Sequence, residues 1–285
     1  MAKAEQVNFW RMPQLGNLEL LHATYVNQCF AKHSHDGFAI GVIENGALKF
    51  SYRGEKVIAP AGCINLVVPG EAHDGCAGSD LGWTYRMFYL EPHLLEQAAD
   101  ELAGSPQKTP FFMAGIIQDD DLASQIRSLH LLLENAELSL MEQESRLLML
   151  LTSFIARHAD QSFAAGHVGK ENRAVQLARE YIEAVYTENI SIKSLAQHCH
   201  LSPFHLIRVF KTHIGVPPHV YQKQVRIKRA KELLGKKLAI AAVAYETGFT
   251  DQSHFSRQFK QITGITPHQY SNIIQEKSPK KGTMK

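Results

Sequence analysis

Short segments of alternating or continuous hydrophobicity fill the first third of the chain. Residues 37–43 and 64–68 are compact apolar runs, whereas residues 47–52 and 83–89 carry a hydrophobic or aromatic side chain at every second position. The Asn-Gly pair at residues 45–46 predicts a tight turn, because these two residue types tolerate the positive φ angles of hairpins. Short strands separated by turns predict a β-sandwich or a β-barrel.

Longer segments with helical periodicity follow these strands. Residues 92–103, 119–135 and 140–158 repeat their hydrophobic positions every three to four residues, which predicts three helices. These helices carry more apolar surface than a soluble protein normally exposes to water. We expect part of this surface to pack on the strands and the remainder to form a homodimer interface. Packing entirely within one chain is the alternative.

The last hundred residues contain one pattern twice. Residues 195–221 reappear as residues 243–270 with one inserted residue. Each copy predicts a short helix, a tight turn and a second helix. In the first copy, Ser202 before Pro203 marks the start of the second helix, because serine caps a helix and proline suits its first turn. The duplication therefore predicts one supersecondary element used twice.

The second helix of each copy has a hydrophobic face and a basic face. Arg208 and Lys211 in the first copy correspond to Arg257 and Lys260 in the second. Arginine bonds to guanine edges in the major groove, and lysine neutralises phosphate. A solvated helix surface is the alternative, but the repetition of both residues favours DNA. The residues that we predict to contact DNA are Ser202, Phe204, His205, Ile207, Arg208, Lys211, Arg226, Lys228, Ser253, His254, Ser256, Arg257 and Lys260.

A basic segment connects the two copies. Residues 217–234 predict a helix about 27 Å long, at 1.5 Å per residue. A rigid helix of this length would hold two recognition helices roughly one DNA turn apart, which is about 34 Å. Arg226 and Lys228 lie among its basic residues, and we expect them to contact phosphates.

This part of the chain resembles the DNA-binding domain of the AraC-type (arabinose-regulator) transcription factors. The resemblance rests on Leu-Ala-x-x-Cys-x-Leu-Ser at 195–202, on Phe-Lys at 210–211 before Gly215, and on Phe-Ser-Arg-Gln-Phe-Lys at 255–260. It implies a monomeric domain of seven helices whose two recognition helices enter successive major grooves.

The two halves of the chain differ in charge. Residues 1–169 contain 11 Lys and Arg against 20 Asp and Glu, a net charge of −9. Residues 170–285 contain 19 Lys and Arg against 8 Asp and Glu, a net charge of +11. The basic half suits nucleic acid and the acidic half does not, so the halves are expected to be separate domains.

Histidines at two places in the first region indicate a binding site. His33-x-His35 precedes one predicted strand, and Pro-Gly-Glu-Ala-His-Asp at 69–74 follows another. This arrangement resembles the cupin barrel, in which the histidines of two such segments meet inside. The ligand-binding domains of AraC-type regulators are built in this way, and Gly-Trp-Thr-Tyr-Arg-Met at 82–87 is similar to their sensory domains.

Two interpretations of these histidines remain open. His33 and His35 project to the same side of an extended chain, and with His73 they could ligate a divalent metal, the one candidate cofactor. The glutamate that the cupin pattern places after the first two histidines is absent, since Ala39 and Ile40 stand there. We favour the alternative, in which the histidines form hydrogen bonds in a polar pocket.

The barrel interior is the expected effector site under either interpretation, because such pockets combine an apolar lining with a few polar groups. The candidate effector-binding residues are His33, His35, Tyr52, Glu71, His73, Trp83, Tyr85 and Arg86. Arg86 would suit a carboxylate or phosphate on the effector. No nucleophile arrangement and no phosphate-binding glycine loop stands out, so we expect no catalytic residues and no enzyme.

The cysteines and the N-terminal sequence indicate a cytoplasmic protein. Cys29, Cys63, Cys76 and Cys199 form no C-x-x-C pair, and we expect reduced thiols. The first residues lack the apolar core of a signal peptide, and no apolar run is long enough to cross a membrane.

These observations predict an α+β fold: an N-terminal cupin-like β-barrel with following helices, then an all-α domain of two helix-turn-helix units. The expected boundaries are 1–160 for effector binding and dimerisation, 161–172 for a linker, 173–275 for DNA binding and 276–285 for a mobile basic tail. The predicted function is effector-responsive, sequence-specific transcription regulation at promoter or operator DNA, more commonly activation together with RNA polymerase. The alternatives are a cupin-type enzyme with a DNA-binding module, and a ligand-independent regulator whose barrel serves only dimerisation.

Overall fold

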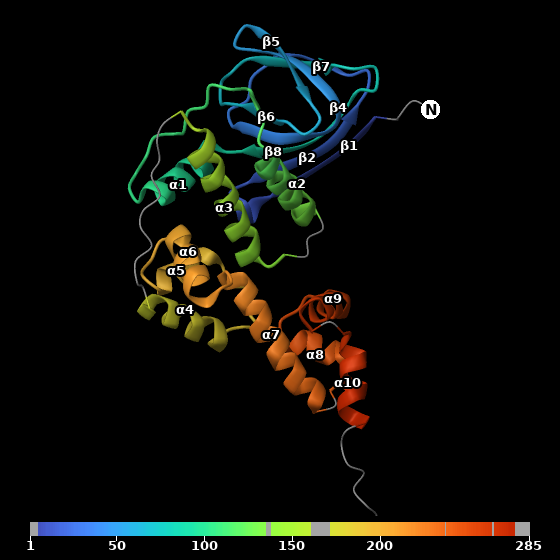
Figure 1. Cartoon of the computed structure of the whole chain (residues 1–285), viewed down its shortest axis with the longest axis vertical. Coiled ribbons are helices and arrows are strands. Elements are labelled where there is room, and N and C mark those ends of the chain that lie inside the picture. Colours follow the sequence, from blue (N-terminus) through green and yellow to red (C-terminus); the bar gives the residue numbers. More distant parts are fainter. Residues whose placement is uncertain (1–4, 135–137, 161–171, 237, 264, 277–285) are drawn as a thin grey trace, which may run out of the picture. The chain divides into compact units, whose positions relative to one another are not determined.

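Two compact units make up the structure, a computed structural model that describes residues 5–134, 138–160, 172–236, 238–263 and 265–276. The barrel unit comprises residues 1–138 and 143–167, and the helical unit comprises residues 139–142 and 168–285. Strands dominate the first and helices the second (Figure 1), which confirms the predicted α+β class. Residues 161–171 of the predicted linker and 277–285 of the predicted tail lie outside the described residues.

Antiparallel strands build the barrel unit. Within the described residues they are β1 (Gln6–Met12), β2 (Leu18–Tyr25), β3 (Cys29–His33), β4 (Phe38–Tyr52), β5 (Glu55–Pro60), β6 (Ile64–Val67), β7 (His73–Ala77), β8 (Trp83–Leu90) and β9 (Ile116–Ile117). One sheet follows the order β1-β2-β8-β4-β6-β9, while β7 pairs with β3 and β4, and β5 pairs with β4. The long strand β4 therefore belongs to both sides of the barrel (Figure 1).

The turn predicted at residues 45–46 is wrong, because β4 runs through it without reversing direction. An Asn-Gly pair closes a hairpin when the flanking segments pair with each other. Here the first half of β4 pairs with β6 and β8, and the second half pairs with β5 and β7. The pairing shifts register between Ile43 and Asn45, and Gly46 takes a φ of +70°. The two residues therefore bend a continuous strand.

Three α-helices of the described residues complete the barrel unit: α1 (Pro92–Ala103), α2 (Asp120–Glu134) and α3 (Leu140–His158), the last from Gln143 onward. Asp119 directly precedes α2 and caps it, because its Oδ1 accepts a hydrogen bond from the amide of Leu122 at 3.0 Å. It packs against β4 and β8. The predicted helices are thus present.

The inner face of the barrel carries the core of this unit. The buried cluster consists of Leu21, Ala23, Ala39, Ile43, Leu48, Phe50, Tyr52, Ala59, Val67, Trp83, Tyr85 and Met87. Successive side chains of a strand point to opposite faces. Strand β8 therefore sends Trp83, Tyr85 and Met87 inward, and the residues between them point to the outer face.

The helical unit contains seven helices among the described residues, as the resemblance implied. They are α4 (Asn172–Ala184), α5 (Ile192–His198), α6 (Pro203–Ile214), α7 (Pro218–Gly235), α8 (Ile240–Glu246), α9 (Gln252–Thr263) and α10 (Pro267–Glu276). Helices α5 and α6 form one helix-turn-helix unit, helices α8 and α9 form the other, and α7 connects them.

Both copies of the duplicated pattern build the same backbone. Ser202 and Asp251 cap α6 and α9, and each accepts a hydrogen bond from the amide three residues onward, at 3.3 and 2.7 Å. The turn of each copy contains one residue in the left-handed region, which is His200 at φ +55° in the first and Gly248 at φ +77° in the second. The duplication predicted from the sequence is confirmed.

Candidate functional site

Helix α9 exposes most of the polar residues predicted to contact DNA. Ser253, Arg257 and Lys260 are exposed. Phe255 and Phe259 on the other side of the helix are buried in the core of the second helix-turn-helix unit. The other predicted residues of this helix, His254 and Ser256, are half-buried. The amphipathic pattern therefore leaves a polar, basic face accessible to a DNA groove.

Helix α6 differs from α9 at two predicted positions. Phe204 and Ile207 are only 7% and 3% exposed, so they do not form the open face that the sequence suggested. Both side chains are hydrocarbon, and burial is favourable for them because it removes apolar surface from water. Arg208 is half-buried with its guanidinium 5.3 Å from the centre of the Phe204 ring. The remaining predicted residues of the first copy are Ser202 and Lys211, which are exposed, and His205, which is half-buried.

Arg226 of α7 is buried and does not serve as the predicted phosphate contact. Its guanidinium donates hydrogen bonds to the carbonyl oxygens of Tyr186 at 2.6 Å, Gly248 at 2.8 Å and Glu188 at 2.9 Å. Burial lowers the pKa of Arg226 to about 10. The backbone carbonyls at the ends of α4 and α8 need donors, and an arginine can serve several of them at once. Arg226 thus connects the two halves of the helical unit.

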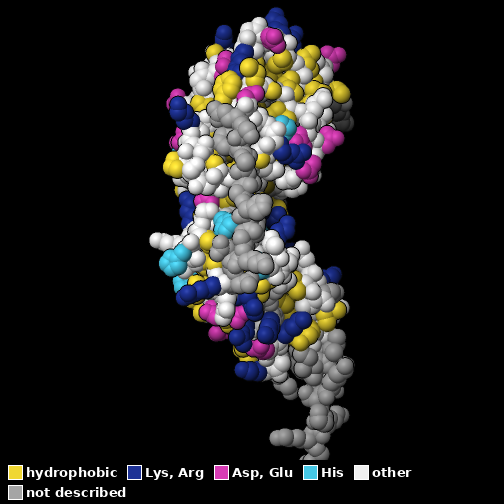
Figure 2. Space-filling model, turned by 60° about the vertical axis from the view of Figure 1, so that its left-hand side comes forward, with side chains coloured by type: hydrophobic (Ala, Val, Ile, Leu, Met, Phe, Trp, Pro, Cys, Tyr) yellow, Lys and Arg dark blue, Asp and Glu magenta, His cyan; other side chains and the backbone are white. Residues whose placement is uncertain are grey.

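Basic side chains remain on the surface of the helical unit. Lys228 and its neighbour Arg229 are exposed on α7. Figure 2 shows Lys and Arg side chains, in dark blue, gathered on one face of this unit. Such a surface attracts the phosphate backbone of DNA irrespective of its sequence.

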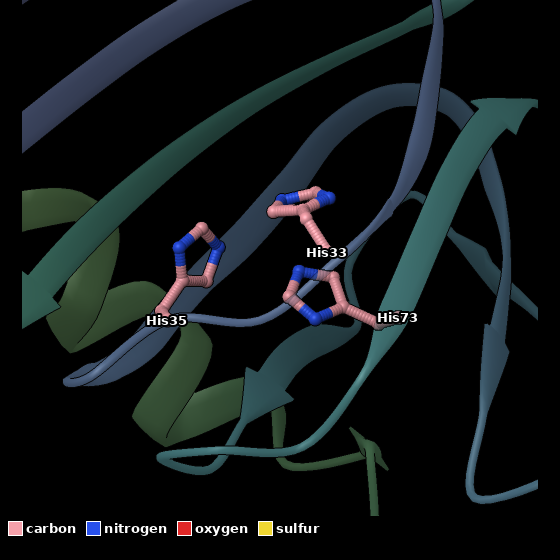
Figure 3. Close-up of side chains that lie close together, drawn as sticks. All are labelled: His33, His35 and His73. Carbon is pink, nitrogen blue, oxygen red and sulfur yellow. The ribbon is translucent and has the colours of Figure 1, made fainter.

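Three histidines meet at one end of the barrel, and we call them the histidine cluster. His33 ends β3, His35 follows in the next loop, and His73 begins β7 opposite His33. Their ring centres lie 4.4–4.9 Å apart, and one nitrogen from each ring lies within 4.8 Å of the others. Figure 3 shows the rings turned toward a shared space. The structure therefore brings together all three residues that the sequence grouped.

Hydrogen bonds orient two of these rings. Nδ1 of His33 lies 2.8 Å from the carbonyl oxygen of Ala31, and Nδ1 of His73 lies 3.0 Å from that of Glu71. A carbonyl oxygen only accepts, so Nδ1 is the donor and Nε2 of a neutral ring keeps its lone pair. Burial, reinforced by the neighbouring histidines, lowers the pKa of His35 to about 4, and burial lowers the pKa of His73.

The histidine cluster forms one wall of a cavity of about 70 Å³, which we call the barrel cavity. Its other walls are formed by Phe30, Ala39, Leu48, Phe50, Asn65, Val67, Asp74, Gly75, Trp83, Tyr85, Met87 and Tyr89. Two buried polar atoms of these walls, Asn65 Oδ1 and Trp83 Nε1, have no hydrogen-bond partner among the described residues. Buried polar atoms cost free energy unless they are paired, so these two favour a bound molecule or water.

Arg86 does not reach the barrel cavity, which corrects one predicted effector contact. It lies on the outer face of β8 because it alternates with Trp83 and Tyr85. Its guanidinium donates to Glu44 at 2.9 Å and to Glu134 of α2 at 2.6 Å, and the residue is only 5% exposed. Arg86 therefore binds α2 to the sheet.

Two further candidates lie outside the lining of the barrel cavity. Glu71 pairs with Arg53, with Oε2 and Nε 3.1 Å apart. Tyr52 belongs to the barrel core, beside His73 in the pairing of β4 with β7. Asn65 and Tyr89 are cavity residues that sequence reasoning missed. A polar residue within the apolar run at 64–68 was a signal for Asn65, because a buried polar group needs a partner.

Comparison with known proteins separates the same two parts of the chain. A model of the AraC-like ligand binding domain matches residues 15–151, and a model of a helix-turn-helix domain matches residues 195–273. The chain is 31% identical over 231 residues to the uncharacterized HTH-type transcriptional regulator YbfI of Bacillus subtilis (strain 168), covering 80% of this chain and 82% of that protein. The chain belongs to the AraC-type family of transcription regulators.

Other relatives of this regulator also match over most of their length. The arabinose operon regulatory protein of Escherichia coli (strain K12) is 26% identical, with 85% of this chain and 82% of that protein covered. The HTH-type transcriptional activator RhaS of Pectobacterium carotovorum subsp. carotovorum (strain PC1) is 26% identical, with 84% and 86% covered. These relatives are transcription regulators.

A disulfide corrects the expectation that all thiols of the regulator are reduced. Cys29 of β3 and Cys76 of β7 stand opposite each other in the strand pairing, with their Cα atoms 4.4 Å apart, and their sulfurs are bonded. Cys63 and Cys199 are free and buried. The two bonded cysteines are 47 residues apart in the chain, so no local sequence motif predicted the disulfide.

In the part of the chain that the structure describes, no helix is both long and apolar enough to cross a bilayer.

Proposed function

We propose that this regulator recognises promoter or operator DNA with both helix-turn-helix units, and that a small molecule in the barrel cavity controls this recognition. The observation that supports DNA recognition is the repeated arginine and lysine on the second helix of each unit. Arg208 and Lys211 on α6 correspond to Arg257 and Lys260 on α9. Arginine reads bases and lysine holds phosphate, so the repeat suits two successive major grooves.

Selection of binding sites from random duplex DNA tests this proposal. The parent should enrich a motif with two parts about one helical turn apart. The Arg208→Ala/Arg257→Ala variant should lose enrichment at both parts. An Arg173→Ala/Lys193→Ala variant removes the same charge from exposed positions on α4 and α5, and it should keep the motif. Equal enrichment by both variants would remove the assigned role of the two arginines.

Effector control is supported by the barrel cavity. Its aromatic walls suit a small molecule, and Asn65 Oδ1 and Trp83 Nε1 need a donor and an acceptor from it. A compound that raises the melting temperature of the protein should change the affinity for the selected DNA. An Asn65→Leu variant should bind that compound more weakly and should still bind DNA. An unchanged response in this variant would place the effector elsewhere.

We further propose that the regulator activates transcription through contact with RNA polymerase and has no enzymatic activity of its own. One relative, RhaS, is named a transcriptional activator, and the relatives described above are transcription regulators. Transcription in vitro from a promoter carrying the selected motif distinguishes activation from repression. More transcript supports activation, and less transcript indicates repression.

The homodimer stays a prediction. The apolar residues that suggested it include Ile126 and Leu133 of α2 and Phe154 and Ile155 of α3, and all four are buried within one chain. They therefore offer little surface to a second copy. Sedimentation of the full chain tests the prediction directly, and a monomer at micromolar concentration would refute it.

A further inference from the structure

We propose that His33, His35 and His73 bind one divalent transition-metal ion, and that this ion anchors the effector through an oxygen atom. The first part stands on the histidine cluster alone. The second part rests on the proposed function of the barrel cavity. The sequence favoured the interpretation without a metal, and the positions of the rings now favour the metal.

The histidine cluster has the composition and nearly the dimensions of a metal site. Zinc holds nitrogen ligands at about 2.0–2.1 Å, which places those nitrogens roughly 3.4 Å from one another. The three nitrogens already lie within 4.8 Å of one another. Closing the site requires movements of about 1 Å, within the range of small side-chain rotations. His33 is exposed and His35 half-buried, so their rings have room to turn.

The hydrogen bonds of the cluster prepare its rings for a metal. The Nδ1–H groups of His33 and His73 point to the backbone carbonyls of Ala31 and Glu71. Metal-binding histidines commonly donate their second N–H to a carbonyl, because this bond fixes the tautomer and the ring orientation. Among the described residues, no hydrogen bond joins one ring of the cluster to another. Nε2 of His33 and of His73 therefore keeps a lone pair, neutral His35 offers a third, and one cation can bind all three.

Three protein ligands leave a coordination position for an exogenous molecule. The histidine cluster is itself a wall of the barrel cavity, so a molecule in the cavity can occupy that position. The cavity lining contains no lysine or arginine, and its one carboxylate, Asp74, accepts a bond from the Ser51 amide at 2.6 Å. A metal ion would supply the positive charge that an anionic oxygen needs.

The remaining polar groups narrow the class of effector. Trp83 Nε1 can only donate, and Asn65 Oδ1 can only accept. A hydroxyl group can meet both requirements, while a carboxylate suits the metal. The chemistry of the cavity therefore fits a small hydroxycarboxylate that coordinates the ion through oxygen.

Metal binding is tested on the full-length protein after removal of metals with a chelator. Titration with Co²⁺ should show one ion per chain, with visible absorption from the bound ion. His33→Ala and His73→Ala should each weaken Co²⁺ binding by at least about a hundredfold. His93→Ala is the control, because His93 is exposed on α1 and outside the cluster. Circular dichroism verifies that the variants are folded, and the exposed position of His33 makes its variant the decisive one.

Two results would overturn the metal site. The parent could fail to bind one Co²⁺ per chain, or the folded His33→Ala variant could bind it as well as the parent. Selective DNA binding is measured in the same preparations. If the parent does not bind DNA selectively, the proposed function is wrong, but the conclusion on metal binding is unchanged.

The anchoring role is tested with glycolate, a small hydroxycarboxylate, added to the Co²⁺-loaded protein. Glycolate should change the absorption of the bound Co²⁺. Trp83→Phe removes the cavity N–H donor, and it should weaken glycolate binding about tenfold while leaving the Co²⁺ affinity unchanged. Absorption that does not respond to glycolate would overturn the anchoring role. An equal response in the parent and in Trp83→Phe would exclude the cavity as the place where the oxygen ligand binds.

Discussion

The two helix-turn-helix units share one sequence pattern and one backbone, but they differ in what their second helices expose. Phe204 and Ile207 of α6 are buried, whereas the corresponding residues of α9, Ser253 and Ser256, are exposed and half-buried. A repeated pattern therefore determines where a recognition helix lies, and the residue at each position determines what it can read. We expect α9 to discriminate more bases than α6.

The largest effect on this pair of units should come from Arg226→Ala. The variant removes the guanidinium that donates to the carbonyls of Tyr186, Glu188 and Gly248 and so connects the two halves of the helical unit. The side-chain amide of Gln222 still donates to Tyr186 and Glu188, whereas Gly248 loses its donor. We expect the free energy of unfolding of the helical unit to fall by about 4 kcal/mol. Urea unfolding followed by helical circular dichroism measures it. Lys228→Ala, at an exposed position of the same helix, should change it by less than about 0.5 kcal/mol.

A smaller loss should follow Gly248→Ala in the turn of the second unit. Gly248 has φ +77°, and an added Cβ would lie 2.4 Å from the carbonyl oxygen of Thr187. We expect a loss of about 2–3 kcal/mol from backbone strain and this contact. Gly215→Ala is the matched control, because Gly215 also has a positive φ but no atom within 4 Å of an added Cβ. It should cost only about 1 kcal/mol, and equal losses would show that the contact with Thr187 is unimportant.

The difference between the recognition helices predicts unequal effects on DNA affinity. Arg257→Ala on the exposed face of α9 should weaken binding to the selected site by about 1–3 kcal/mol and relax base preference there. Arg208→Ala should act in the same direction but more weakly, because Arg208 is half-buried against Phe204. Titration of labelled duplexes at fixed salt measures both. A larger loss for Arg208→Ala would reverse the proposed ranking of the two helices.

The smallest effect should be a gain from His200→Gly in the first unit. His200 holds the left-handed conformation that Gly248 holds in the second, at φ +55°. Glycine relieves the strain of a side chain in this conformation but increases the entropy of the unfolded chain. We expect the free energy of unfolding to rise by about 0.5–1 kcal/mol. A decrease would mean that the His200 side chain stabilises the turn.

Much of the fold could be predicted because its signals are local. The spacing of Phe255 and Phe259 identified the buried side of α9, and the exposed Arg257 and Lys260 lie where that spacing placed them. The candidate site was harder to predict. The alternation of residues in β8 places Arg86 on the opposite face from Trp83 and Tyr85. The positive charge of Arg86 nevertheless led us to predict that it lines the cavity. The structure shows that the alternation was the better guide.

The sequence by itself determined several strands of the first domain, the two helix-turn-helix units and the difference in charge between the domains, because periodicity and capping act between residues close in the chain. Only the tertiary structure decided which distant groups meet. It made β4 one bent strand, turned Arg226 inward, joined Cys29 to Cys76 and placed Asn65 in the lining of the same cavity as the histidine cluster. Each of these depends on the pairing of segments far apart in the chain, and no local pattern specifies that pairing.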